Sequence, residues 1–134
     1  GVALIGRYTE RFFDALMVAS SKAQTPKEKL HAFRKVYRGA LYEDKAVCLC
    51  WLLGAEMAGL PPALVDGVTS FFEANVKWVS DALPNDLSKA EKYKRASTLV
   101  AAHQGAMMMA ISSDDNKFFD TVTEFLISNT LGQD

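Results

Sequence analysis

The chain has 134 residues, which suits one domain with a single hydrophobic core. Lysine and arginine number 15 against 16 aspartates and glutamates, the formal net charge is −1, and no basic cluster stands out. Proteins that bind nucleic acid through its phosphates need such a cluster, so we do not expect the chain to bind DNA by itself. The longest uncharged apolar run, residues 46–55, is about half a membrane span, which argues against a membrane helix.

The chain begins directly in a helical pattern. Apolar residues recur at helical spacing from Ile5 to Ala19 and predict a first helix over residues 2–21. Because this pattern starts at once and without an initiator methionine, we expect the chain to be part of a longer protein.

A capping box predicts the start of the second helix. Thr25 can accept a hydrogen bond from the backbone at Glu28, Glu28 can reach back, and Pro26 suits the first helical turn. The apolar stripe of this helix runs from Leu30 to Leu41. Its basic residues form a side that we expect to face solvent: Lys27, Lys29, Arg34, Lys35 and Arg38.

The third predicted helix is the most apolar segment of the chain. It follows Asp44 as its cap and ends near Gly59, before a double proline. Only Glu56 interrupts its apolar surface. A helix that is apolar on all sides must be enclosed by others or line a buried cavity, so we expect it at the centre of the fold.

The two cysteines, Cys48 and Cys50, lie in this third helix. Their side chains diverge by about 200° on a helix and do not bridge to each other. The lack of a disulfide framework fits a reducing, cytoplasmic compartment. Buried cysteines act as small apolar groups, and the alternative of a reactive thiol stays open. Together with His31 and His103 they match no common zinc pattern, so we expect no metal and no cofactor.

Three further helices follow. The fourth starts at the double proline and runs to Leu83. The fifth follows a second capping box, Ser88 with Glu91, and continues to about Ile111. The sixth begins after Asp114 and is aromatic on one face.

No alternating run of strand length competes with these helices. The predicted fold class is therefore all-α, a six-helix bundle that spans residues 1–134 as a single domain.

The last two predicted helices carry more apolar surface than one edge of a bundle leaves to water. Small residues at three- and four-residue spacing on the fifth let another helix approach closely, and the sixth has little polar cover between Phe118 and Leu126. We expect a homodimer in which these helices of two copies form a two-fold four-helix interface. The predicted interface residues are Ala102, Gly105, Ala106, Met109, Phe118, Val122, Phe125 and Leu126.

The order of these features resembles the C-terminal regulatory domain of TetR-family transcriptional regulators. VALIGRYTERFFDAL resembles the long helix that follows the DNA-binding headpiece in that family, and TPKEKLHAFRKVYR resembles the next helix. CLCWLLGAEMAGLPPALVDGVTSFFEANVKWVSDAL is similar to the central pair of helices, and ASTLVAAHQGAMMMAISSDDNKFFDTVTEFL to the final two. The helix-turn-helix headpiece of the family has no counterpart in this chain.

The resemblance implies an effector-sensing and dimerisation domain of a transcriptional repressor. Such domains pair through their last two helices and hold a small hydrophobic effector between the middle helices. The effector shifts the first helix, and this movement releases operator DNA from the headpiece. By this resemblance, operator DNA is a partner only through the headpiece that this chain lacks.

The candidate effector-binding residues are mostly aromatic, with a few polar groups to orient a ligand. Each aromatic residue has core packing as its alternative role. His103 and Gln104 are candidate polar anchors at the pocket wall, and for His103 the alternative is a bond to a backbone carbonyl or exposure to solvent. The predicted set is Phe12, Leu16, Phe33, Tyr37, Trp51, Phe72, Asn75, Trp78, His103 and Met107.

The sequence contains no pattern that predicts an enzyme. It has no glycine-rich phosphate loop, no nucleophile elbow and no metal-ligand pair at helical spacing. The alternative to a repressor domain is a standalone helical domain that binds a ligand or a protein partner and has no role at DNA.

Overall fold

The computed structural model describes residues 2–44, 59 and 61–132, and this part of the chain is all helical. No described helix combines the length and the apolar character needed to cross a membrane. The elements are α1 (Val2–Ser20), α2 (Pro26–Gly39), the π-helix η1 (Ala40–Asp44), α4 (Pro62–Ala82), α5 (Lys89–Ser113) and α6 (Asn116–Thr130).

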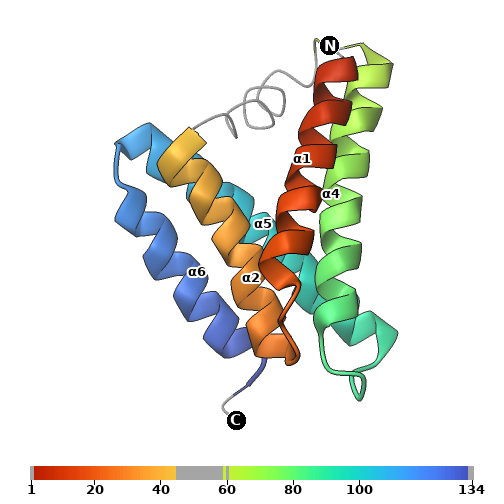
Figure 1. Cartoon of the computed structure of the whole chain (residues 1–134), viewed down its shortest axis with the longest axis vertical. Coiled ribbons are helices and arrows are strands. Elements are labelled where there is room, and N and C mark those ends of the chain that lie inside the picture. The colour runs from red at the N-terminus through yellow and green to blue at the C-terminus, as the bar shows by residue number, and fades with distance from the viewer. Residues whose placement is uncertain (1, 45–58, 60, 133–134) are drawn as a thin grey trace.

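The described helices surround one main core (Figure 1). α1 lies beside α4 on one side of the molecule, α2 lies beside α6 on the other, and α5 crosses behind them. α5 packs most extensively against α6, and α2 contacts α1, α4, α5 and α6. Within the described part of the chain, α2 is therefore the element that every other α-helix meets.

The start of α2 confirms the predicted capping box. The backbone N–H of Glu28 donates to Thr25 Oγ1 at 3.1 Å, and the backbone N–H of Thr25 donates to Glu28 Oε1 at 3.1 Å. Pro26 opens the helix, where its missing N–H costs nothing. Hydrogen bonds from the backbone of Gln24 and Thr25 lower the pKa of the Glu28 carboxyl.

The segment after α2 corrects the prediction that Asp44 caps a new helix. Residues Ala40–Asp44 continue directly from α2 as a π-helix, so Asp44 belongs to a helical turn that began before it. The wider π turn directs Leu41 into the core and lets the Tyr42 hydroxyl reach α6. The rest of the predicted third helix, with Cys48, Cys50 and Glu56, lies outside the described residues, which form five α-helices against the six predicted.

Both ends of α5 differ in detail from the prediction. Ser88 caps α5 by accepting from the backbone N–H of Glu91 at 3.1 Å, but the Glu91 carboxylate binds Arg95 on the next turn at 2.8 Å. Only one half of the predicted second capping box is therefore present. α5 runs two residues beyond Ile111 and ends at Asp114, whose left-handed backbone (φ 52°) turns the chain into α6.

A polar cluster joins α2 to α6. Arg34 donates through Nη2 to Asp120 Oδ1 and through Nε to Thr123 Oγ1, both at 2.8 Å. Arg38 Nε reaches the same Asp120 oxygen at 2.8 Å, and the Tyr42 hydroxyl donates to Asp120 Oδ2 at 2.7 Å. The prediction of a solvated basic side is therefore wrong for Arg34, whose side chain is only 13% exposed.

Asp120 is the shared acceptor of this α2–α6 cluster. Partial burial acts to raise the pKa of its carboxyl, but hydrogen bonds from Arg38 and Tyr42 and the charges of Arg38 and Arg34 outweigh burial and hold that pKa below its usual value. The carboxylate is therefore the form that ties the two helices together.

Replacing Asp120 by asparagine tests this cluster. We expect Asp120→Asn to lower the free energy of unfolding by about 1–3 kcal/mol, because hydrogen bonds to a charged group are lost on a half-buried surface. The matched control is Asp81→Asn, which breaks an exposed pair with Lys77 on one helix and costs at most about 0.5 kcal/mol. Urea denaturation measures both, and equal small losses would contradict the assignment.

Candidate functional site

Three side chains from three helices form a hydrogen-bonded chain inside the bundle. Gln104 of α5 donates through Nε2 to the Tyr37 hydroxyl at 2.8 Å. Tyr37 of α2 donates to Asn75 Oδ1 of α4 at 2.9 Å, and Asn75 Nδ2 donates to the Phe71 carbonyl at 2.8 Å. Tyr37 is 1% exposed and Asn75 is fully buried. Tertiary packing therefore places these polar groups, and it shields Tyr37 and Asn75 from water while Gln104 is partly buried.

Aromatic rings surround this polar chain. The Phe12 ring of α1 lies 5.2 Å from the rings of both Tyr37 and Phe71, in edge contacts. Phe33 lies 5.0 Å from Tyr37 and stacks on Trp78 at 6.0 Å. Hydrogen bonds are electrostatically stronger in such a low-dielectric setting, and an unmade one costs more. The site can thus combine apolar contact with directional polar recognition.

His103 lies at the edge of the same cluster and is fully buried. Its Nδ1 lies 2.8 Å from the Leu99 carbonyl, and its ring makes edge contacts with Phe33, Tyr37 and Phe119. Nε2 has no hydrogen-bond partner among the residues that the structure describes. Burial lowers the pKa of His103 to about 4, although the bond to Leu99 acts in the opposite direction. The ring is therefore neutral near pH 7.

The structure brings most of the predicted effector-binding residues into this one region. Phe72 and Trp78 are partly buried against the main core, and Trp51 lies outside the described residues. The fully or almost fully buried members are Phe12, Leu16, Phe33, Tyr37, Asn75, His103 and Met107. Among the residues that the structure describes, no group of histidine, cysteine, aspartate and glutamate is arranged to hold a metal ion.

Two further phenylalanines are buried beside the predicted set. Phe71 is 1% exposed and contacts Tyr8, Phe12, Phe13 and its neighbour Phe72. On α6, Phe119 is fully buried against His103. Each belongs to a Phe-Phe pair, and adjacent residues on a helix differ by about 100° in direction. The repeating apolar pattern does not say which member of such a pair faces the core.

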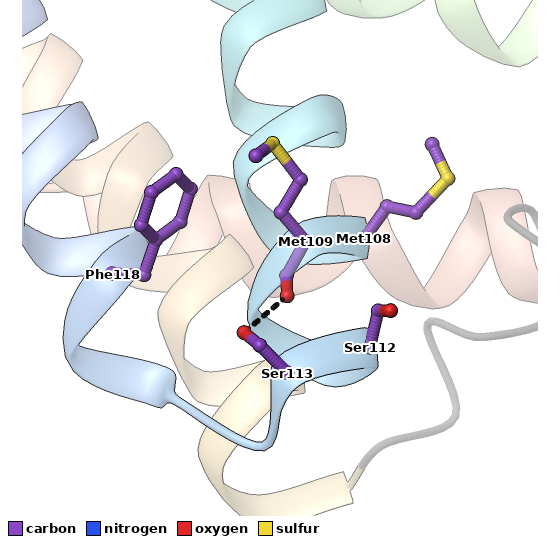
Figure 2. A pocket seen from close by; sticks show the side chains of 5 residues that line it. All are labelled: Met108, Met109, Ser112, Ser113 and Phe118. Carbon is purple, nitrogen blue, oxygen red and sulfur yellow. Dashed lines mark hydrogen bonds between the residues drawn. The ribbon is translucent and has the colours of Figure 1, made fainter.

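A second apolar feature lies on the surface where α5 turns into α6 (Figure 2). Met108, Met109 and Phe118, with Ser112 and Ser113, line a hollow of about 410 Å³. Met108 is 40% exposed and Met109 is 55% exposed. The Ser113 hydroxyl donates to the Met109 carbonyl at 2.7 Å, which turns its polar hydrogen back onto the helix. The lining is therefore mainly apolar.

Two of the predicted dimer-interface residues, Met109 and Phe118, line this hollow. Phe125 is 69% exposed, and a Cβ added at Gly105 would meet open space. Ala106 is 3% exposed and belongs to the core of the single chain. The partly buried members are Ala102, Gly105, Phe118, Val122 and Leu126.

Comparison with known proteins identifies the fold. No protein-family model matches the chain, and no curated protein matches it by sequence. Among solved structures, the chain is similar to a TetR transcriptional regulator from Legionella pneumophila, with a TM-score of 0.84 and 22% sequence identity. The match covers 94% of this chain and 69% of that one. The chain therefore has a TetR-like fold.

The buried His103 predicts a pH dependence of stability. The pKa of His103 is about 4 in the folded chain against 6.5 for the free side chain, so the unfolded state binds the proton more tightly. We expect stability to fall as the pH drops from about 6.5 towards 4, by up to roughly 3 kcal/mol. Chemical denaturation across this range measures the loss. In His103→Phe most of this slope should vanish, and an unchanged slope would refute the assignment.

Proposed function

We propose that the chain is the effector-sensing and dimerisation domain of a TetR-type transcriptional repressor. The TetR-like fold supports the class of protein. The observation that supports ligand sensing is the Gln104–Tyr37–Asn75 chain, which joins three helices inside an aromatic core. Small-molecule sites of this kind combine apolar walls with a few fixed polar groups, and bundles build them between facing helices.

The proposed effector is a small hydrophobic molecule held between α2, α4 and α5. Its binding would move the rings that Phe12 touches, namely Phe33, Tyr37 and Phe71. Because Phe12 belongs to α1, such a movement reaches the first helix of the domain, which would relay it to a DNA-binding headpiece outside this chain. A tenfold change in operator affinity needs only about 1.4 kcal/mol of preference for the released state.

The proposed dimer forms through α5 and α6. Exposed Met109 and Phe125 and the open space beside Gly105 supply an apolar face on which a second copy can pack. The bonds from Arg34 to Asp120 and Thr123 hold α6 against α2, so this face is presented by a well-anchored helix. The domain would thus work as a symmetric pair in the cytoplasm, without catalytic activity.

Sedimentation tests the dimer with a matched pair of variants. We expect the chain to be a dimer at tens of micromolar and Phe125→Lys to weaken association at least tenfold, because a charge would enter an apolar interface. Tyr93→Lys is the control, since Tyr93 is 67% exposed, close to the 69% of Phe125, but lies outside the predicted interface. A wild-type chain that sediments as a monomer would exclude this part of the proposal.

A titration with para-xylene tests the effector site. The chain has two tryptophans, and Trp78 stacks on Phe33 beside the site. An apolar guest that displaces Phe33 should therefore change the tryptophan emission in a saturable way, and Trp78→Phe should remove most of the change. If calorimetry and fluorescence both show that neither para-xylene nor its phenolic analogue para-cresol binds, the core site is not an effector site.

A further inference from the structure

His103 presents an unused hydrogen-bond acceptor to the interior of the proposed site. A carbonyl oxygen only accepts hydrogen bonds, so the Nδ1 atom that lies 2.8 Å from the Leu99 carbonyl must carry the proton. A neutral imidazole has one such proton, and burial keeps this ring neutral. Nε2 therefore carries a lone pair, and no donor of the described residues binds it.

A phenylalanine at position 103 would keep the ring contacts without the free-energy cost of a buried, unpaired nitrogen. Buried polar atoms are rarely left unpaired, so this acceptor is a place where a donor group can bind. The donor must reach a place bounded by Phe33, Tyr37 and Phe119, whose ring centres lie 5.3, 5.4 and 5.7 Å from that of His103. These neighbours favour a flat or compact apolar body around the donor group.

Resting on the proposed function, we propose that His103 Nε2 accepts a hydrogen bond from the effector, and that the effector is a neutral, largely apolar molecule with one hydroxyl or N–H donor, such as a phenol. Phe33 connects this point to the surface, because it contacts both His103 and the partly exposed Trp78. The donor group of the effector binds His103 Nε2, and its apolar body takes the place of contacts that the aromatic side chains now make with one another.

The charges around His103 disfavour an anionic effector. A carboxylate would face the Nε2 lone pair, because the neutral ring has no proton to donate there. The cation whose charge acts on His103 is Arg34. Its guanidinium is already bound to Asp120 and Thr123. A donor without charge is therefore the group that this position recognises.

Para-cresol and para-xylene form the test pair, because they differ only by a hydroxyl in place of a methyl group. Calorimetry gives the ratio of their affinities for the wild-type chain and for His103→Phe. We expect the ratio to shift at least tenfold away from para-cresol in the variant, because a site built to pair a hydroxyl discriminates strongly against an analogue without it. An unchanged ratio overturns the role of His103 and leaves the effector site standing.

Ser97→Ala is the matched control for this experiment. In the described part of the chain, Ser97 Oγ is the other buried side-chain atom without a partner, and it lies on the same helix. Six residues separate it from His103, which places it about 9 Å away along α5 and about 120° around it. The affinity ratio should match the wild type in this variant, and a shift equal to that of His103→Phe overturns the proposal. Failure of both compounds to bind the wild type overturns the effector site as well.

A measurement on the wild-type chain covers the case in which His103→Phe does not fold. The chain has two histidines, so isotopically labelled histidine gives few ring-nitrogen resonances, and exposed His31 serves as the internal reference. At neutral pH, Nε2 of His103 should resonate as an unprotonated nitrogen. It should shift upfield with para-cresol and stay in place with para-xylene. A protonated Nε2, or equal responses to both compounds, contradicts the inference.

Discussion

The hydroxyl of Tyr37 is the point on which the described structure depends. It accepts a hydrogen bond from Gln104 of α5 and donates one to Asn75 of α4, while its ring packs against Phe12 of α1. One side chain of α2 thus contacts three other helices inside a shielded core. Removing the hydroxyl would leave Asn75 Oδ1, which is fully buried, without this donor, and an unpaired polar atom is costly in a low-dielectric interior.

Polar contacts on two faces fix the position of α2 in the bundle. At its buried face the Tyr37 bonds fix α2 relative to α4 and α5, and at its outer face Arg34 and Arg38 bind Asp120 of α6. Apolar packing alone would tolerate small rotations of α2, because it has little directional preference. Hydrogen bonds on both faces select one orientation, so a disturbance in the core can be transmitted to α6 through α2.

His103 departs from this pattern of paired polar groups. Its Nδ1 uses the carbonyl of Leu99 within α5, and its Nε2 stays unpaired among aromatic rings. In natural cores nearly all buried polar atoms have a hydrogen-bond partner, and the exceptions concentrate at functional sites. The ring of His103 contacts that of Tyr37, so the proposed effector site includes both the unpaired atom and the polar chain.

The sequence by itself determined the helical class, the helix order and the local start of α2, because these follow from apolar periodicity and from the reach of Thr25 and Glu28 to each other's backbone. It also pointed to Asn75, His103 and Gln104 as polar groups among apolar ones. Tertiary structure alone decided which groups meet, since Tyr37 finds Asn75 across 38 residues and Gln104 across 67. It likewise decided the π turn after α2 and which phenylalanine of each adjacent pair faces inward. Apolar periodicity predicts on which side of its own helix a residue lies. The rotation and register of one helix against another are set only when all the side chains pack together.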